Sequence, residues 1–238
     1  MPSRIKLIHG DCLEVLPTLP AGSVNMVLCD LPYGITACEW DKVISMELLW
    51  IEYKRLLTPN GVVVLFGSQP FTSYLVTSNL KDFKHEWIWR KPQGTNPFMA
   101  RKAPMKNHES ILVFGNKTTY NPQMVSGKPY GGFESSDKRI GQIYGASKSV
   151  HTPNKGIRFP KSVIDFPQVR TCSLHPTQKP IPLLEYLILT YSNAGDTVLD
   201  NCMGSGSTGV ACKNLKRNFI GIEISEEYYK ICVKRLHN

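Results

Sequence analysis

Short apolar runs alternate with segments of helical periodicity along most of this 238-residue chain, and this alternation limits the possible folds more than any other feature. The runs are rich in Val, Ile and Leu without strict polar alternation, which is typical of strands buried on both faces of a parallel sheet. We predict strands at Ile5–His9, Val24–Cys29, Gly61–Phe66, His85–Arg90, Ser110–Phe114, Thr197–Asp200 and Phe219–Ile224.

Helical patterns fill the intervals between these runs. We predict helices at Ser45–Leu57, Pro180–Tyr191, Thr208–Leu215 and Glu226–Leu236. A Pro-Asn-Gly turn at 59–61 ends the first helix, and prolines at the start of the second suit a first helical turn. Alternating strands and helices favour an α/β sheet that is covered by helices on both faces.

Residues 117–170 break the alternation. They are rich in Gly, Ser, Pro and Tyr, have no long periodic segment, and contain nine Lys or Arg against three Asp or Glu. A loop this long inside a compact domain is uncommon unless it is functional or disordered. We therefore expect one domain formed by residues 1–116 and 171–238, and an irregular basic insertion at 117–170 that either grips a polyanion or is a solvated, mobile surface segment.

Composition narrows the class of protein. The net charge of +9 and the pI of about 9.2 favour a polyanionic partner such as nucleic acid, although charge by itself is weak evidence. No apolar stretch reaches the ~18 residues of a membrane span, and the N-terminal apolar run is too short for a signal peptide. The seven cysteines include no CxxC pair and no zinc-site spacing, so we expect no metal and mostly buried thiols in a reducing compartment.

A glycine-rich segment at 200–209, DNCMGSGSTG, follows one predicted strand and opens a predicted helix. Its glycines allow a tight turn and close approach of a ligand, and the helix start offers free N–H groups to a carboxylate or phosphate. Glu223 ends the next strand, nineteen residues after Gly204, where a carboxylate suits a ribose diol. A nicotinamide enzyme or a purely structural turn fits this segment too, but Val210-Ala211 replaces the Lys-Ser/Thr of a phosphate-binding loop.

A second motif, Asp30-Leu-Pro-Tyr33-Gly34, follows the predicted strand Val24–Cys29 directly. Ligands of open α/β sheets bind at such carboxyl ends of strands. A carboxylate and a backbone carbonyl can accept both hydrogens of an exocyclic amine and so make its delocalised lone pair reactive, while an aromatic ring stacks on the base. The alternative is an ordinary β-turn, which Asp, Pro and Gly also favour.

A third motif, His175-Pro-Thr-Gln-Lys-Pro180, precedes a predicted helix and presents a cation and several hydrogen-bond donors. Together the three motifs resemble those of the amino-group DNA methyltransferases of the β-type arrangement. That family carries a D-P-P-Y-type motif, a target-recognition segment, an H-P-x-Q-K-P-type motif and a glycine-rich cofactor loop, in this order, so residues 117–170 would be the target-recognition, DNA-binding insertion. The resemblance covers nearly the whole chain, although Leu31 replaces the usual first proline and Asn-Cys-Met at 201–203 replaces a frequent Pro-Phe-x.

The resemblance implies a Rossmann-like class I methyltransferase fold, with a seven-stranded, mostly parallel sheet, one antiparallel strand near an edge and helices on both faces. It implies S-adenosylmethionine as cofactor and direct methyl transfer to a base flipped out of double-stranded DNA, without a covalent enzyme intermediate. Aspartate at position 30 favours adenine N6 as the target, since cytosine-N4 enzymes more often carry serine there. An N4-cytosine enzyme, an RNA methyltransferase and an inactive DNA-binding relative remain alternatives, whereas only 29 residues after Gly209 leave no room for the second half of a nicotinamide enzyme.

Site residues follow from the resemblance position by position. The catalytic residues would be Asp30, Pro32 and Tyr33, together with the Leu31 carbonyl. The cofactor-binding residues would be Asp11, Cys12, Asp30, His175, Thr177, Lys179, Asp200, Gly204, Ser205, Gly206 and Glu223. In this set, Glu223 would bind the ribose hydroxyls, residues 204–206 the methionine part, and Asp11-Cys12 would lie near the adenine. Asp200 would shape the loop or contact the methionine amino group.

We expect DNA backbone contacts from nine basic residues: Arg90, Lys91, Arg101, Lys102, Lys128, Lys138, Arg139, Lys155 and Arg158. The resemblance also implies a cytoplasmic, nucleoid-associated protein that is encoded by a bacterium or phage, with no membrane association. A homodimer and a restriction endonuclease on a separate chain are further partners that it allows.

Overall fold

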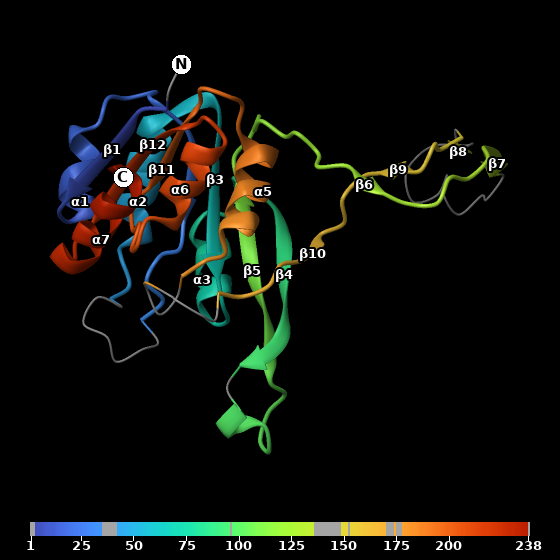
Figure 1. Cartoon of the computed structure of the whole chain (residues 1–238), viewed down its shortest axis with the longest axis horizontal. Helices are drawn as coiled ribbons and strands as arrows, with labels where there is room; N and C mark the ends of the chain where they lie inside the picture. Colours follow the sequence, from blue (N-terminus) through green and yellow to red (C-terminus); the bar gives the residue numbers. More distant parts are fainter. Residues whose placement is uncertain are drawn as a thin grey trace. The chain divides into compact units, whose positions relative to one another are not determined.

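The computed structural model describes residues 3–34, 42–95, 97–135, 149–151, 153–169, 174 and 178–237. The chain divides into two compact units, Met1–Asn121 with Ser162–Asn238, and Pro122–Lys161. Within the described residues, the first unit holds an eight-stranded sheet with the order β1-β12-β11-β2-β3-β5-β4-β10 (Figure 1).

The eight strands of this sheet all run in one direction except β5, which is antiparallel to both β3 and β4. Their bounds are β1 (Ile5–His9), β2 (Val24–Cys29), β3 (Leu57–Gly67), β4 (Phe83–Thr95), β5 (Lys106–Phe114), β10 (Val163–Asp165), β11 (Thr197–Asp200) and β12 (Asn218–Glu223). The seven predicted strands coincide with or overlap seven of these. The expected count of seven is wrong by one, because β10 is a three-residue edge strand inside the segment predicted to be irregular.

Helices cover both faces of the sheet, as predicted. They are α1 (Cys12–Val15), α2 (Met46–Leu56), α3 (Phe71–Ser78), α5 (Ile181–Tyr191), α6 (Ser207–Asn214) and α7 (Glu226–His237), with 3-10 turns η1 (Leu16–Thr18) and η2 (Pro97–Met99). The four predicted helices are present, whereas α1 and α3 were not predicted because each is short. No helix in the described part of the chain combines the length and the apolar character that crossing a membrane requires.

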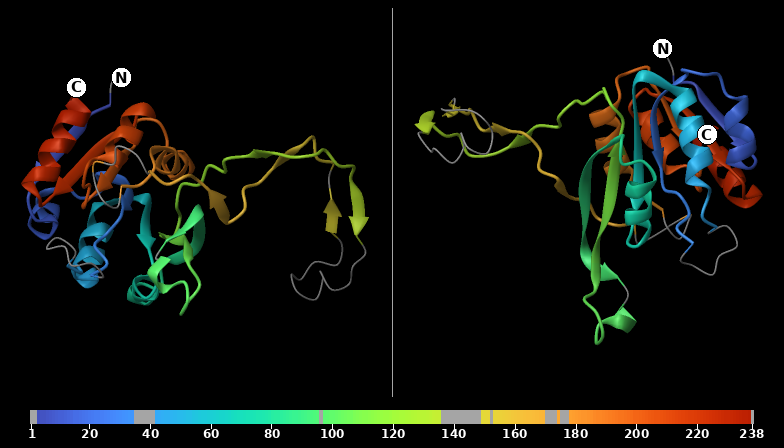
Figure 2. Two further views of the ribbon diagram at one scale, coloured as in Figure 1. Left: turned by 60° about the horizontal axis from the view of Figure 1, so that its bottom comes forward. Right: turned by 180° about the vertical axis from the view of Figure 1, so that it is seen from behind.

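The core of the first unit consists of two apolar layers, one on each side of the sheet. Alternate residues of β2 divide between them: Met26 and Leu28 face the layer under α5, α6 and α7, while Val27 and Cys29 face the layer under α1, α2 and α3. Figure 2 shows these two sets of helices on opposite faces. Burial of the central strands on both sides explains their continuous apolar sequence.

The second unit, Pro122–Lys161, is an antiparallel ribbon in the part that the structure describes. β6 (Val125–Ser126) pairs with β9 (Ile157–Arg158), and β7 (Phe133–Ser135) pairs with β8 (Ser149–His151). Its larger apolar side chains are exposed rather than packed in a core, for example Phe159. The unit is shorter than the predicted insertion at 117–170, because the residues of β10 join the main sheet.

Candidate active site

Acidic side chains collect at one edge of the sheet because neighbouring parallel strands end there. Asp11 comes shortly after β1, Asp30 follows β2, and Asp200 and Glu223 are the last residues of β11 and β12. The reversed strand β5 begins at the same edge and brings Glu109 to it. Five carboxylates from separate parts of the chain thus lie along one edge.

The glycine-rich segment forms a tight loop between β11 and α6. Gly204 and Gly206 adopt left-handed backbone conformations, with φ of 51° and 78°. A Cβ atom on Gly206 would lie 2.4 Å from the Cys232 sulfur, so a larger residue does not fit without rearrangement. The Gly204 N–H donates to Glu223 Oε2 over 2.8 Å and fixes the loop against β12.

The carboxylate of Asp200 stabilises this loop through two hydrogen bonds. Its Oδ2 accepts a hydrogen bond from the Thr208 hydroxyl at 2.7 Å, and its Oδ1 accepts one from the Cys202 N–H at 3.2 Å. The side chain is buried, and this burial raises the pKa of Asp200 to about 6. Of the two predicted roles, this geometry supports shaping of the loop.

Glu223 is buried at the end of β12, and burial raises the pKa of its carboxyl group. Oε1 accepts from the Ser225 N–H and Oε2 from the Gly204 N–H, each over 2.8 Å. The Ile224 N–H also interacts with this carboxyl group, so three backbone donors hold Glu223 in place. A carboxylate has about four acceptor sites, so Glu223 can still accept a hydrogen bond from a ligand.

The residues after β1 have mainly local contacts. Asp11 accepts a hydrogen bond from the Leu13 N–H over 2.8 Å and caps α1. Burial raises the pKa of Cys29 to about 12, and a hydrogen bond with Cys202 together with burial raises the pKa of Cys12. Cys12 and Cys29 are buried, as predicted for most of the cysteines.

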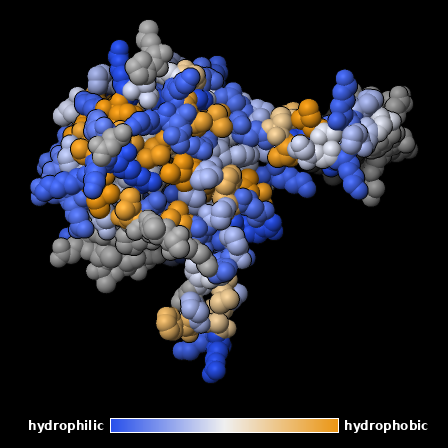
Figure 3. Space-filling view, in the orientation of Figure 1, coloured by the Kyte–Doolittle hydropathy of each residue, from blue (hydrophilic) through white to orange (hydrophobic). Residues whose placement is uncertain are grey.

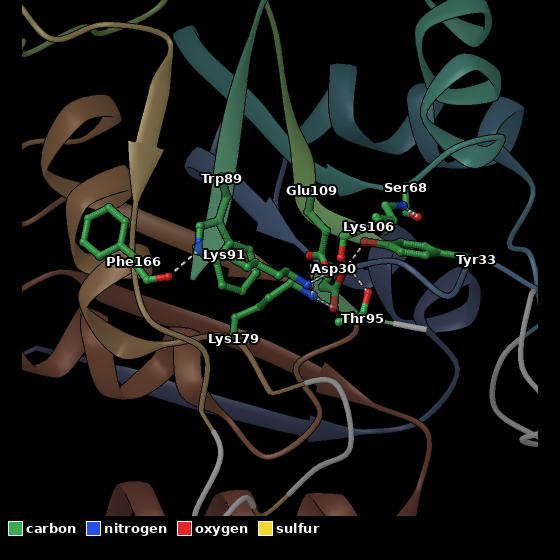
Figure 4. A network of polar contacts seen from close by, with 10 residues as sticks. All are labelled: Asp30, Tyr33, Ser68, Trp89, Lys91, Thr95, Lys106, Glu109, Phe166 and Lys179. Atoms are coloured by element: carbon green, nitrogen blue, oxygen red, sulfur yellow. Dashed lines mark hydrogen bonds and ion pairs between the residues drawn. The ribbon is translucent and has the colours of Figure 1, made fainter. Parts of the chain in front are cut away.

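Asp30 and Tyr33 face each other across the turn after β2 (Figure 4). The Tyr33 hydroxyl donates to Asp30 Oδ1 over 2.7 Å. The Tyr33 ring stacks on Phe71, with ring centroids 4.9 Å apart and planes inclined by 28°. Leu31 between them is buried and anchors the turn in the core. The motif is thus a fixed carboxylate beside a fixed aromatic ring.

Lys179 joins this motif to a buried network of charges (Figure 4). Its ammonium group is ion-paired with Asp30 Oδ2 and lies 3.7 Å from Glu109 Oε2, while Lys91 is ion-paired with Glu109 Oε1. Burial would lower the pKa of Lys179, but Asp30 and Glu109 outweigh it and raise that pKa. Burial would raise the pKa of Glu109, but Lys179 and Lys91 outweigh it and lower that pKa. Both groups are therefore ionised at neutral pH.

The family of the chain follows from comparison with known proteins, because residues 24–234 match the N6_N4_Mtase family of DNA methylases. The chain belongs to this DNA methylase family. Type II methyltransferase M.HpaI of Haemophilus parainfluenzae is 30% identical over 97% of this chain and 74% of its own length. DNA adenine methyltransferase YhdJ of Escherichia coli is 31% identical over 97% of this chain and 82% of its own length.

Solved structures agree on the fold of this DNA methylase. The M1.HpyAVI–SAM complex matches with a TM-score of 0.66 and 29% identity, over 98% of this chain and 100% of that one. The cytosine-N4-specific PvuII DNA methyltransferase matches with a TM-score of 0.67 over 99% of this chain and 87% of that one. Its identity of 16% makes this a likeness of fold alone. The Rossmann-like class I methyltransferase fold is thereby confirmed.

The predicted basic residues occupy different surroundings in this DNA methylase. Lys91 is buried and ion-paired with Glu109, so it belongs to the polar network. Arg90 is exposed but ion-paired with Asp165. Arg101 and Lys102 are exposed on the segment between β4 and β5. In the second unit, the predicted basic residues that are exposed are Lys128, Lys155 and Arg158.

Some predicted residues lie outside the described part of the chain, namely Lys138, Arg139, His175 and Thr177. Two residues of the DNA methylase site were not predicted, Glu109 and Phe71. Glu109 is a charged residue directly before the predicted strand Ser110–Phe114, and that position at a strand end was a usable signal. Phe71 opens a helix that was itself not predicted.

Proposed function

We propose that this DNA methylase transfers a methyl group from S-adenosylmethionine to N6 of adenine in double-stranded DNA. The observation that carries the proposal is the pairing of β2 with β11, which sets the Asp30–Tyr33 motif beside the strand that leads into the glycine loop. A target amine and a methyl donor would be held by adjacent strands of one sheet. The adenine specificity named for YhdJ, and the aspartate at position 30, support adenine over cytosine.

The residues at the glycine loop fit S-adenosylmethionine. Gly206 packs against Cys232 of α7 and leaves no room for a side chain in the loop, and Glu223, held by backbone N–H groups, would accept a hydrogen bond from a ribose hydroxyl. Residues 204–206 would hold the methionine part, and Asp11-Cys12 would lie near the adenine. Lys179, with His175 and Thr177, would close the site. The bound cofactor supplies a methyl group that its positively charged sulfur already activates.

The protein's contribution to the chemistry lies in Asp30, the backbone after it, and Tyr33. Asp30 Oδ1 accepts one hydrogen bond from Tyr33, and Oδ2 is ion-paired with Lys179. Each oxygen can accept another hydrogen bond. Hydrogen bonds from the target amine to Asp30 and to the Leu31 carbonyl would make its nitrogen lone pair available for attack. Pro32 fixes the turn, and the Tyr33 ring would stack on the flipped base. Asp30 would also receive the proton that the amine loses after transfer.

The exposed basic residues and the second unit would bind the DNA backbone. Several relatives are named type II methyltransferases, which supports a restriction endonuclease on a separate chain as a functional partner. A homodimer is a further arrangement that the family allows. We place the enzyme in the cytoplasm, at the nucleoid.

Methyl transfer from labelled S-adenosylmethionine to unmodified bacterial genomic DNA, followed by nucleoside analysis, tests the function. We expect N6-methyladenine from the wild-type enzyme and none from Asp30→Ala. N4-methylcytosine would keep the fold and the chemistry but overturn the assignment of the target base. Cofactor binding without transfer to DNA, or transfer to RNA alone, would overturn DNA as the substrate.

A further inference from the structure

The strands β4 and β5 continue past the catalytic edge as a projecting hairpin (Figure 1, and the right-hand view of Figure 2). The two strands of its stem pair as far as Thr95, with one irregularity of register after Arg90. Thr95 pairs with Lys106 in the ladder, and the Thr95 hydroxyl donates to the Lys106 carbonyl over 3.0 Å. A Cβ atom on Gly94 would lie 2.7 Å from that of Met105, so the two strands are in close contact there.

This stem begins at the active site. Lys106 contacts Ser68 at the end of β3, and Glu109 on the same strand reaches Lys179 and, through it, Asp30 (Figure 4). A segment that projects from this position stands next to wherever the target base enters. The hairpin is therefore placed to act on the DNA around the target, and not only to bind it at a distance.

The tip of the hairpin combines one large apolar side chain with positive charge. Phe98, in η2, is 96% exposed. Arg101 and Lys102 are exposed on the same tip, and the sequence has no Asp or Glu from Arg90 to His108. Figure 3 shows apolar and strongly hydrophilic surface side by side on this projection. The Ala100 N–H donates to the Pro97 carbonyl over 3.1 Å, so the tip has a fixed turn.

Single exposed apolar residues are common and need no explanation by themselves. Here the aromatic ring lies at the tip of the projecting hairpin, beside the proposed site of base methylation, and the described part of the chain shows no ion pair for Arg101 or Lys102. Positive charge around an apolar side chain suits a duplex, which offers phosphates outside and apolar base faces inside.

We propose that Phe98 is a wedge that enters the base stack of duplex DNA when the target adenine is flipped out, while Arg101 and Lys102 hold the adjacent phosphates. This inference rests on the proposed function and goes beyond it by assigning the residue that compensates for the lost stacking. The wedge fills the space that the extruded base leaves and so favours the flipped state. Its benefit depends on the target being paired, because an unpaired base costs less to extrude.

The wedge is tested by comparing a paired target base with an unpaired one. After the methylated sequence has been mapped, kcat/KM is measured on two duplex oligonucleotides, one fully paired and one with an abasic site opposite the target adenine. We expect Phe98→Ala to lower kcat/KM by about 10- to 100-fold on the paired duplex and by less than about threefold on the abasic one. With 2-aminopurine in place of the target adenine, the fluorescence rise on binding should be strongly reduced in the variant.

Leu80→Ala is a matched control, since Leu80 is an apolar residue that is 66% exposed outside the hairpin. It should behave as wild type on both duplexes. R101Q/K102Q should weaken binding to both duplexes alike, and the slope of log affinity against log salt concentration should become shallower by about two. Unlike Phe98→Ala, this variant should be impaired as much on the abasic duplex as on the paired one.

Two results would overturn the wedge. Phe98→Ala could methylate the paired duplex as fast as wild type, or it could lose the same factor on both duplexes with its melting temperature unchanged. Both leave the methyltransferase function intact, because the wild type is active in the same assay. A wild type that methylates neither duplex would instead overturn the proposed function.

Discussion

Asp30 is the side chain on which the proposed chemistry depends most. Asp30→Asn keeps the size of the side chain, but an amide has one acceptor oxygen instead of two and places N–H donors against Lys179 or Tyr33. We expect kcat to fall roughly 100- to 1,000-fold, as when one preorganised polar group is lost from an active site. Cofactor affinity, measured by calorimetry, should fall far less than kcat. A variant with near-normal kcat would remove Asp30 from the mechanism.

Glu109 stabilises the protein because it balances two buried ammonium groups. Glu109→Gln leaves Lys91 and Lys179 with one carboxylate fewer, which we expect to cost about 3 kcal/mol of unfolding free energy at neutral pH. Lys91→Met in the Glu109→Gln background removes the surplus cation, so the double variant should be more stable than the single one. Chemical denaturation of both variants measures this. Equal stability of Glu109→Gln and wild type would contradict the network.

The lowered pKa of Glu109 predicts that the stability of the protein depends on pH. The folded state holds the pKa of Glu109 below its ordinary value of 4.5, so its ionised form stabilises the fold above pH 4.5. This contribution is lost as the pH falls below 4.5 through the lower pKa of the folded state. Between neutral pH and pH 3, the stability difference between wild type and Glu109→Gln should therefore shrink. Thermal unfolding across this range checks it, and a constant difference would be the contrary result.

The glycine loop at the start of α6 allows a comparison between two glycines with the same backbone requirement. Gly206 and Gly22 both have positive φ, 78° and 64°, but a Cβ on Gly206 meets the Cys232 sulfur whereas one on Gly22 meets nothing within 4 Å. We expect Gly22→Ala to cost about 1 kcal/mol from backbone strain alone. Gly206→Ala should cost about 1–3 kcal/mol more and weaken cofactor binding about tenfold or more. Equal effects of the two variants would contradict the packing of this loop.

Sequence patterns predicted the central strands of the sheet correctly. They did not predict elements or ion pairs that depend on contacts with residues far away in the chain. β1 and β11 have the bounds that their apolar runs predict, because Gly, Asp and Pro residues limit those runs. α3 carries four Ser or Thr residues among eight, which weakens any helical signal, and β10 exists only through its pairing with β4. Motifs located Asp30, but not its ion pair with Lys179, 149 residues away.

The molecule combines a unit that has a large apolar core with a second unit, Pro122–Lys161, whose described apolar side chains are mostly exposed. A two-stranded ribbon of this kind is marginally stable in water by itself. Its excess of basic residues therefore suits a segment that gains order on a polyanion. The sequence predicted an irregular insertion at 117–170, but it could not give the pairing of β6 with β9, because such short strands carry no periodicity.

If the second unit binds the DNA backbone, its lysines displace counter-ions from the DNA phosphates. Each such contact contributes about 0.9 to the slope of log affinity against log salt concentration. Replacement of the exposed Lys128 and Lys155 by glutamine should make this slope shallower by about 1.8 while cofactor binding is unchanged. The matched control replaces Lys54 and Lys234, which are exposed on α2 and α7, and should leave the slope as in wild type. Fluorescence anisotropy with a labelled duplex at several salt concentrations measures both. An unchanged slope for the Lys128 and Lys155 variant would leave DNA binding to the first unit alone.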